Sequence, residues 1–177
     1  RSERDWIRHR TVLSGEIGNQ SSQTDNSPML VLGAKGAVLD GFVLTGTYCS
    51  ESDSNSGPSS FGATWKDFAV VARTGSGTSA ENYDFLVEHC LFQGNKYMQP
   101  LVMGWVKLRS CVIMGNETTS SGAYYKVLAD GGRFEYCTVV GNTGGYFSQS
   151  SYTYFNNCYF CNPGFNPKYA SRYSYGD

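Results

Sequence analysis

Five short segments of the chain repeat one pattern of apolar and polar positions. Each segment has an apolar residue, two turn-forming residues, a fourth residue that is cysteine in four of the five cases, a spacer and a second apolar residue. A unit that recurs in this way indicates a repeat architecture. The segments are residues 39–44 (LDGFVL), 87–92 (VEHCLF), 108–113 (LRSCVI), 134–139 (FEYCTV) and 155–160 (FNNCYF), and we call them the corner motifs.

The spacing of the corner motifs and their internal alternation predict pairs of β-strands that meet at a corner. Successive motif cysteines are 21, 26 and 21 residues apart, which is too short for a helical-hairpin repeat. The fourth and sixth positions of each motif lie on the same face of a strand, because side chains alternate with a period of two residues. The first position is three residues before the fourth and would face the opposite side of a straight strand. A two-residue bend between them returns the first apolar residue to the inner side. The predicted bends are residues 40–41, 88–89, 109–110, 135–136 and 156–157, whose polar or small side chains tolerate the left-handed or bridging backbone that such a corner needs.

A turn follows each second strand, because Gly-Asn occurs at 94–95, 115–116 and 141–142, with Gly46-Thr47 and Asn162-Pro163 as variants. Upstream apolar runs at 29–32, 68–71, 101–103 and 124–128 supply a third strand. We therefore predict an all-β chain that folds as a right-handed parallel β-helix, a solenoid of about five to six coils of three short strands with long polar loops. An antiparallel sandwich also uses short strands and glycine turns, but it does not explain the recurring cysteine.

The length of 177 residues predicts a single β-helix domain over 1–177. Within it, residues 1–18 are an entry strand, residues 38–162 carry the coils with the corner motifs, and residues 163–177 are an irregular tail. Polar loops are expected at 19–28, 47–66 and 73–84, and long insertions in a solenoid usually carry its specificity.

The motif cysteines Cys90, Cys111, Cys137 and Cys158 are expected to stack inside one corner as a structural ladder of buried, reduced thiols. The backbone spacing of about 4.8 Å between coils would also permit disulfides. Cys49 and Cys161 fall outside the ladder, and we expect each to be a free or locally buried thiol.

Charge and hydropathy exclude several classes of partner. The net charge of −1 and the pI near 6.1 leave no basic patch for nucleic acid, and no apolar run is long enough to span a membrane. We expect no cofactor. We expect no metal site either, because His9 and His89 lack a partner histidine or a CxxC motif, and His89 occupies a bend.

Four stretches resemble bacterial right-handed β-helix repeat proteins of the pectate-lyase-like superfamily, of the polymorphic outer-membrane-protein type and the large secreted surface proteins of Bacteroidota. The stretches are 2–6 (SERDW), 10–18 (RTVLSGEIG), 26–27 (NS) and 38–46 (VLDGFVLTG), and the cysteine and Gly-Asn repeat extends the resemblance over 85–162. The resemblance implies export and display at a bacterial cell surface. That family holds adhesins, structural surface proteins and, more distantly, polysaccharide lyases and hydrolases.

We therefore expect a non-enzymatic extracellular module with a structural or adhesive role. The alternative is a carbohydrate-active enzyme, either a polysaccharide lyase or a glycoside hydrolase, which needs clustered carboxylates. The bend column contains Glu88, Arg109 and Glu135, and Asp130 lies near a turn. These are the candidate catalytic residues, and we interpret the column instead as a solvated, charge-compensated corner.

Two kinds of partner are expected. Tyrosines recur near strand positions and form either an outward row that binds a glycan or protein partner, or a cover between strands. The candidate binding residues are Tyr124, Tyr125, Tyr146 and Tyr152, and the same pattern includes Tyr97, Tyr154 and Tyr159. The uncapped entry strand at 11–13 suggests association through the coil ends, with other copies or with another β-helix chain.

Overall fold

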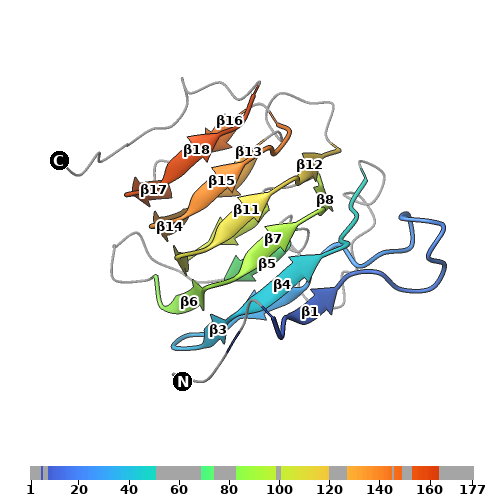
Figure 1. Ribbon diagram of the computed structural model, residues 1–177, viewed down its shortest axis with the longest axis horizontal. Helices are drawn as coiled ribbons and strands as arrows, with labels where there is room; N and C mark the ends of the chain where they lie inside the picture. The colour runs from blue at the N-terminus through green and yellow to red at the C-terminus, as the bar shows by residue number, and fades with distance from the viewer. Residues whose placement is uncertain are drawn as a thin grey trace.

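The computed structural model describes residue 5 and residues 8–50, 69–73, 83–98, 101–119, 127–144, 146–148 and 153–163. This part of the chain is all-β, has no helix, and its neighbouring strands run parallel (Figure 1). It therefore contains no helix long and apolar enough to cross a bilayer.

The strands form three main sheets, A, B and C, and a small sheet D. Sheet A contains β1 (Thr11–Ser14), β4 (Phe42–Thr45), β7 (Leu91–Gln93), β11 (Val112–Met114), β15 (Thr138–Val140) and β18 (Tyr159–Cys161). Sheet B contains β2 (Val31–Gly33), β5 (Val71–Arg73), β9 (Val102–Gly104), β13 (Val127–Asp130) and β16 (Tyr146–Ser148). Sheet C contains β3 (Val38–Asp40), β6 (Phe85–Glu88), β10 (Val106–Arg109), β14 (Gly132–Glu135) and β17 (Thr153–Asn156). Sheet D pairs β8 (Lys96–Tyr97) with β12 (Glu117–Thr118).

The chain visits the three main sheets in turn, and each strand pairs with the strand one round earlier or later. Figure 1 shows the rounds of the chain stacked in order from β1 to β18. The predicted all-β class and parallel pairing are confirmed, and the arrangement is consistent with a β-solenoid. The upstream strands begin one to three residues later than the apolar runs predicted, and the sequence did not indicate sheet D.

The predicted bends lie between sheet C and sheet A. The second bend residue has a left-handed backbone in all five motifs: Gly41 at φ 77°, His89 and Ser110 at 52°, Tyr136 at 55° and Asn157 at 50°. This conformation costs a non-glycine residue about 1–2 kcal/mol. The fold accepts that cost because the bend turns the apolar residues on both of its sides toward the interior.

One hydrophobic core draws side chains from all three main sheets. Aligned positions stack in layers, as Phe92, Ile113 and Val139 do in sheet A, and each of these three side chains is fully buried. Phenylalanines fill the last round: Phe155 lies 4.8 Å from Phe134 and 5.0 Å from Phe160 between ring centroids. Because the parallel strands pair in register, apolar side chains at equivalent positions of successive rounds stack on one another.

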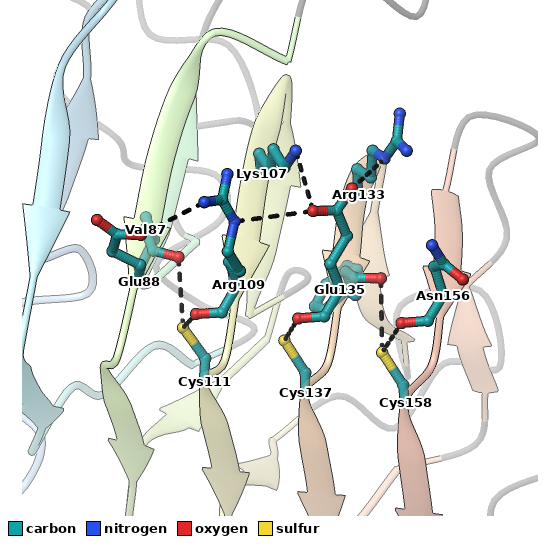
Figure 2. Close-up of polar contacts among 11 residues, drawn as sticks. Val87, Glu88, Lys107, Arg109, Cys111, Arg133, Glu135, Cys137, Asn156 and Cys158 are labelled. Atoms are coloured by element: carbon teal, nitrogen blue, oxygen red, sulfur yellow. Dashed lines mark hydrogen bonds and ion pairs between the residues drawn. The ribbon is translucent and has the colours of Figure 1, made fainter.

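The motif cysteines line the corner between sheets C and A, as predicted. Cys90, Cys111 and Cys137 are buried, Cys158 is half-buried, and all four are free thiols. Each thiol donates to a backbone carbonyl within its own bend. Cys111 Sγ, for example, donates to Arg109 O at 3.4 Å (Figure 2). Burial raises the pKa of the Cys111 thiol well above its ordinary value. Outside this ladder, Cys49 is buried beside Met98 and Cys161 is exposed.

A second ladder, made of asparagines, runs through the turns that follow sheet A. Asn95, Asn116 and Asn142 are at most 1% exposed, and Asn162 continues the column. The Oδ1 of Asn116, Asn142 and Asn162 accepts hydrogen bonds from the backbone N–H and the Nδ2 of the asparagine one round earlier, as in Asn95 N to Asn116 Oδ1 at 3.1 Å and Asn95 Nδ2 to the same oxygen at 2.9 Å. Asn95 Oδ1 accepts instead from the N–H and the hydroxyl of Thr47. The Nδ2 group also donates to a carbonyl of the round before, as in Asn116 Nδ2 to Phe92 O at 3.1 Å. We call this column the asparagine ladder, and it satisfies backbone groups that the buried turns leave unpaired.

Replacing Asn116 by alanine should therefore destabilise the protein strongly, because it leaves buried donors and acceptors of two neighbouring rounds without partners. Each unpaired buried group costs about 1–3 kcal/mol, so we expect Asn116→Ala to lower the free energy of unfolding by about 2–4 kcal/mol. Urea unfolding measures this loss. Gln93→Ala, at an exposed position of sheet A, is the control and should change stability by less than about 0.5 kcal/mol. Equal losses in the two variants would contradict the role of the ladder.

Candidate functional site

The outer face of sheet C carries two rows of aligned side chains. Strand register places Leu86, Lys107, Arg133 and Tyr154 in one row. The second row contains Asp40, Glu88, Arg109, Glu135 and Asn156, one from each strand of the sheet. The structure thus aligns the bend residues that the sequence predicted as a column, and the row beside them contains the cations Lys107 and Arg133.

Glu135 is the centre of this face. Its carboxylate lies 2.7 Å from Arg133 Nε, 2.9 Å from Lys107 Nζ and 3.8 Å from Arg109 Nε (Figure 2). The Glu135 residue is 8% exposed, so these charges meet with little solvent between them. Arg109 also lies 3.8 Å from Glu88, so it bridges the two glutamates of its row.

The surrounding cations keep Glu135 ionised. Burial alone raises the pKa of its carboxyl, but the hydrogen bond and charge of Lys107, together with Arg133, outweigh burial and hold the pKa below its ordinary value. A carboxyl that is ionised at neutral pH cannot serve as the general acid that a glycosidase needs. Glu88, Arg109 and Glu135 thus form a charge-compensated cluster, as we interpreted the column, but Glu135 is buried and not solvated as that interpretation expected.

Asp130 does not belong to this row. It ends β13 in sheet B, where it pairs with Met103, whereas the two glutamates belong to sheet C. Among the candidate binding tyrosines, Tyr124, Tyr125 and Tyr152 lie outside the described residues, and Tyr146 is described only as backbone of β16. The proposed tyrosine row is therefore not tested.

A different aromatic group lies on the outer face of sheet C. The ring of Tyr83 packs edge-on against Trp105 at 5.3 Å and against Tyr154 at 6.1 Å between centroids. Burial, with the nearby Tyr154, raises the pKa of Tyr83 to about 12 despite the charge of Arg133. We call Tyr83, Trp105 and Tyr154 the aromatic cluster.

The sequence pattern indicated only one member of the aromatic cluster, Tyr154. Tyr83 lies two residues before β6 and Trp105 one residue before β10, so an aromatic residue close to the start of a sheet-C strand is the signal that could have identified them. Of the other tyrosines in the pattern, Tyr97 is buried and donates to Thr143 O at 3.3 Å, whereas Tyr159 is exposed on sheet A. Tyr97 thus packs as a cover between strands, which was the second of the two expectations for the tyrosines.

The bend at Asp40, Glu88 and His89 brings three potential metal ligands together, which the sequence analysis missed. Their ligand atoms lie within 4.8 Å of one another, and His89 Nδ1 is 3.0 Å from Asp40 Oδ1. Asp40 is 48 residues from Glu88 in the sequence, and only the pairing of β3 with β6 makes them neighbours. His89 bonds to Asp40, and Glu88 pairs with Arg109, so each of the three side chains has a partner within this corner.

A shallow pocket of about 270 Å³ lies near the same corner on the side of sheet A. Apolar side chains such as Val43, Leu91 and Val112 line it, and Arg10 and His89 contribute polar groups. No carboxylate is among its lining residues in the described part of the chain. The described lining of this pocket therefore does not supply the pair of carboxylates that most glycoside hydrolases use.

Comparison of the chain with family models, with curated proteins and with solved structures found no match in any of the three. The family resemblance of the sequence motifs therefore remains a proposal.

The environment of Glu135 predicts a pH-dependent contribution to stability. The folded pKa lies below the unfolded value near 4.3, so the carboxylate stabilises the fold above about pH 4.5 and this contribution is lost as pH falls through the folded pKa. Glu135→Gln should lower the free energy of unfolding by about 1.5–3 kcal/mol at pH 7, because hydrogen bonds to charged groups have this magnitude. The difference from wild type should shrink in urea unfolding series as pH falls below about 4.5.

Glu117→Gln is the control for this change. Glu117 is 56% exposed and 3.7 Å from Lys96, so its loss should cost less than about 0.5 kcal/mol. A Glu135→Gln deficit that keeps its full size at pH 3 would contradict the lost charge as its cause.

Proposed function

We propose that the chain winds as a right-handed parallel β-helix, with one strand of sheets A, B and C in each coil. The cyclic order of the strands, the repeated bends and the single interior core support this winding. The right hand follows from strand twist, which favours right-handed crossovers between parallel strands.

We also propose that the protein is a bacterial cell-surface module of the β-helix repeat type, with a structural or adhesive role and no catalytic activity. The cysteine ladder and the asparagine ladder repeat the same contacts in successive rounds, and such repetition suits a stiff, extended scaffold. The two glutamates of the sheet-C face pair with neighbouring cations, and the pocket described near them has no carboxylate among its described lining residues. These observations support a scaffold over a lyase or hydrolase.

The observation that carries the adhesive role is the aromatic cluster beside a row of hydrogen-bonding side chains. Tyr83, Trp105 and Tyr154 offer aromatic surface, and sugar rings stack on such surface through their C–H faces. Register places Tyr154 next to Arg133, whose side chain is 42% exposed and binds Glu135 through Nε. Such a combination of apolar and multidentate polar groups suits a hydroxyl-rich glycan.

Glycan binding predicts that the aromatic cluster determines affinity. Trp105→Ala and Tyr154→Ala should each weaken binding to a responsive glycan by about tenfold or more, because a central aromatic anchor contributes at least about 1–2 kcal/mol. A panel of immobilised bacterial and host polysaccharides identifies the glycan, and calorimetry with its soluble oligosaccharide measures the affinity.

Tyr159→Ala is the matched control, since it removes a tyrosine that is 63% exposed on sheet A. It should leave binding unchanged. Wild-type protein that binds no member of the panel, or a Tyr159→Ala loss as large as that of Tyr154→Ala, would contradict a glycan-binding face on sheet C.

We further propose association through the coil ends, with a second copy or another β-helix chain. Within the described residues β1 pairs with β4 alone, and β2 and β3 likewise form sheet edges. Val12, Leu32 and Val38 on these strands are 53–55% exposed. A parallel strand that adds to these edges would cover apolar surface and pair free backbone groups.

Val12→Pro tests the edge at β1. Gly15 N donates to Thr45 O, so the Gly15 N–H points toward β4. Because N–H directions alternate along a strand, the Val12 N–H points away from β4. Proline at position 12 therefore blocks an added strand without breaking the β1–β4 pairing. Sedimentation velocity over a range of concentrations should show association of the wild type, and a shift of Val12→Pro toward monomer. Wild-type protein that stays monomeric up to about 10⁻⁴ M would contradict self-association, because a dissociation constant above that value is weaker than that of most specific dimers.

A further inference from the structure

The ladder position holds Glu16 in the first round and Thr47 in the second, and asparagine from Asn95 onward. Register pairs Ser14 with Thr45, which places Gly15-Glu16 beside Gly46-Thr47, and these in turn lie beside Gly94-Asn95. In the later rounds the ladder oxygen accepts from the round before it. Within the described residues no round precedes β1, so the oxygens of Glu16 have no such donor.

A second polar side chain, Asn26, lies against Glu16. Asn26 is 8% exposed, and its Nδ2 donates to Glu16 Oε2 at 3.2 Å and to Gly46 O at 2.7 Å. Ser27 N donates to Gly15 O at 2.8 Å and closes the loop that joins the two residues. The amide and the carboxylate are therefore fixed by the backbone of two rounds.

Two oxygens of this pair have no hydrogen-bond partner although both are buried: Glu16 Oε1 and Asn26 Oδ1. Both atoms are acceptors, so they cannot satisfy each other. A buried carboxylate oxygen without a donor or a cation costs several kcal/mol, and such an atom in a folded protein usually marks an ion, a water molecule or a proton. Within the described residues neither oxygen has a donor, and each has less than 1 Å² of accessible area; oxygen atoms of this kind are the ligands of hard divalent cations.

We propose that Glu16 Oε1 and Asn26 Oδ1 bind a calcium ion at the first round of the ladder. Carboxylate and amide oxygens are the ligands that hard divalent cations prefer, and this pair offers no nitrogen or sulfur ligand. The charge of Asp25, whose Oδ2 accepts from Asn19 N at 2.9 Å in the same loop, adds to the negative potential. The ion would fix residues 15–27 against the first round, in the place where the ladder has no further asparagine.

Calcium binding is tested by thermal unfolding and calorimetry of the whole chain after dialysis against a chelator. With one carboxylate ligand we expect a dissociation constant on the order of 10⁻⁴ to 10⁻³ M, as in extracellular calcium modules. Calcium chloride at ten times that value should raise the Tm of the wild type by about 3–6 °C, with one ion bound per chain. Magnesium chloride should raise it less, because Mg²⁺ dehydrates reluctantly.

Glu16→Gln removes the charge and keeps the shape. Its amide can donate to Asn26 Oδ1, so without calcium this variant should be at least as stable as the wild type and should not respond to calcium. Glu117→Gln, at an exposed carboxylate, is the matched control and should keep the full response. Wild-type protein whose Tm does not respond to calcium, or a Glu16→Gln variant that binds calcium as the wild type does, would overturn the site.

The competing occupant is a proton on Glu16. In that case the wild type would bind no calcium in the calorimeter at pH 7, and this result would also overturn the proposal. A magnesium response equal to that of calcium would overturn the assignment of calcium. None of these outcomes bears on glycan binding by sheet C, so the two proposals fail or succeed separately.

Discussion

The fold depends on how its buried turns satisfy their backbone hydrogen bonds. A strand that ends inside a stack leaves N–H and C=O groups away from water, and the parallel sheets do not pair these groups. In this protein the side chains of Asn95, Asn116 and Asn142 replace the missing partners, each one joining its own round to the rounds before and after it. Because asparagine carries both a donor and an acceptor on a short side chain, the same residue can repeat at every round.

The ladder also sets the register of everything outside it. Once each turn is bonded to the next, the strands of sheet C must align, and Glu88, Arg109 and Glu135 become neighbours. Like charges would then repel along a column, and the alternation of acid and base removes that repulsion. Lys107 and Arg133 in the adjacent row add two more cations around Glu135. The charged face is thus a consequence of stacking, and the aromatic cluster lies beside it on the same surface.

Particular residues show how far sequence reasoning extends. The bends were predictable to the residue, even at Tyr136, because a two-residue shift between apolar positions allows one geometry and because four other motifs repeat it. The cysteine ladder followed from the same pattern. The Gly-Asn dipeptides were interpreted only as turns, since nothing local indicates that an asparagine side chain points inward to bond with a residue more than 20 positions away. The cluster of Asp40, Glu88 and His89 was missed for the same reason.

The sequence by itself determined the all-β class, the places where the chain bends and the identity of the buried stacking positions. These depend on short-range alternation of apolar residues, which each motif carries within six positions. Only the tertiary structure decided which distant polar groups meet: the three cations around Glu135, the rings of Tyr83 and Tyr154, and the unpaired oxygens of Glu16 and Asn26. Loop lengths between rounds vary from one motif to the next, so register across the sheets, and with it every long-range polar contact, is set by the stacking of the strands and not by spacing along the chain.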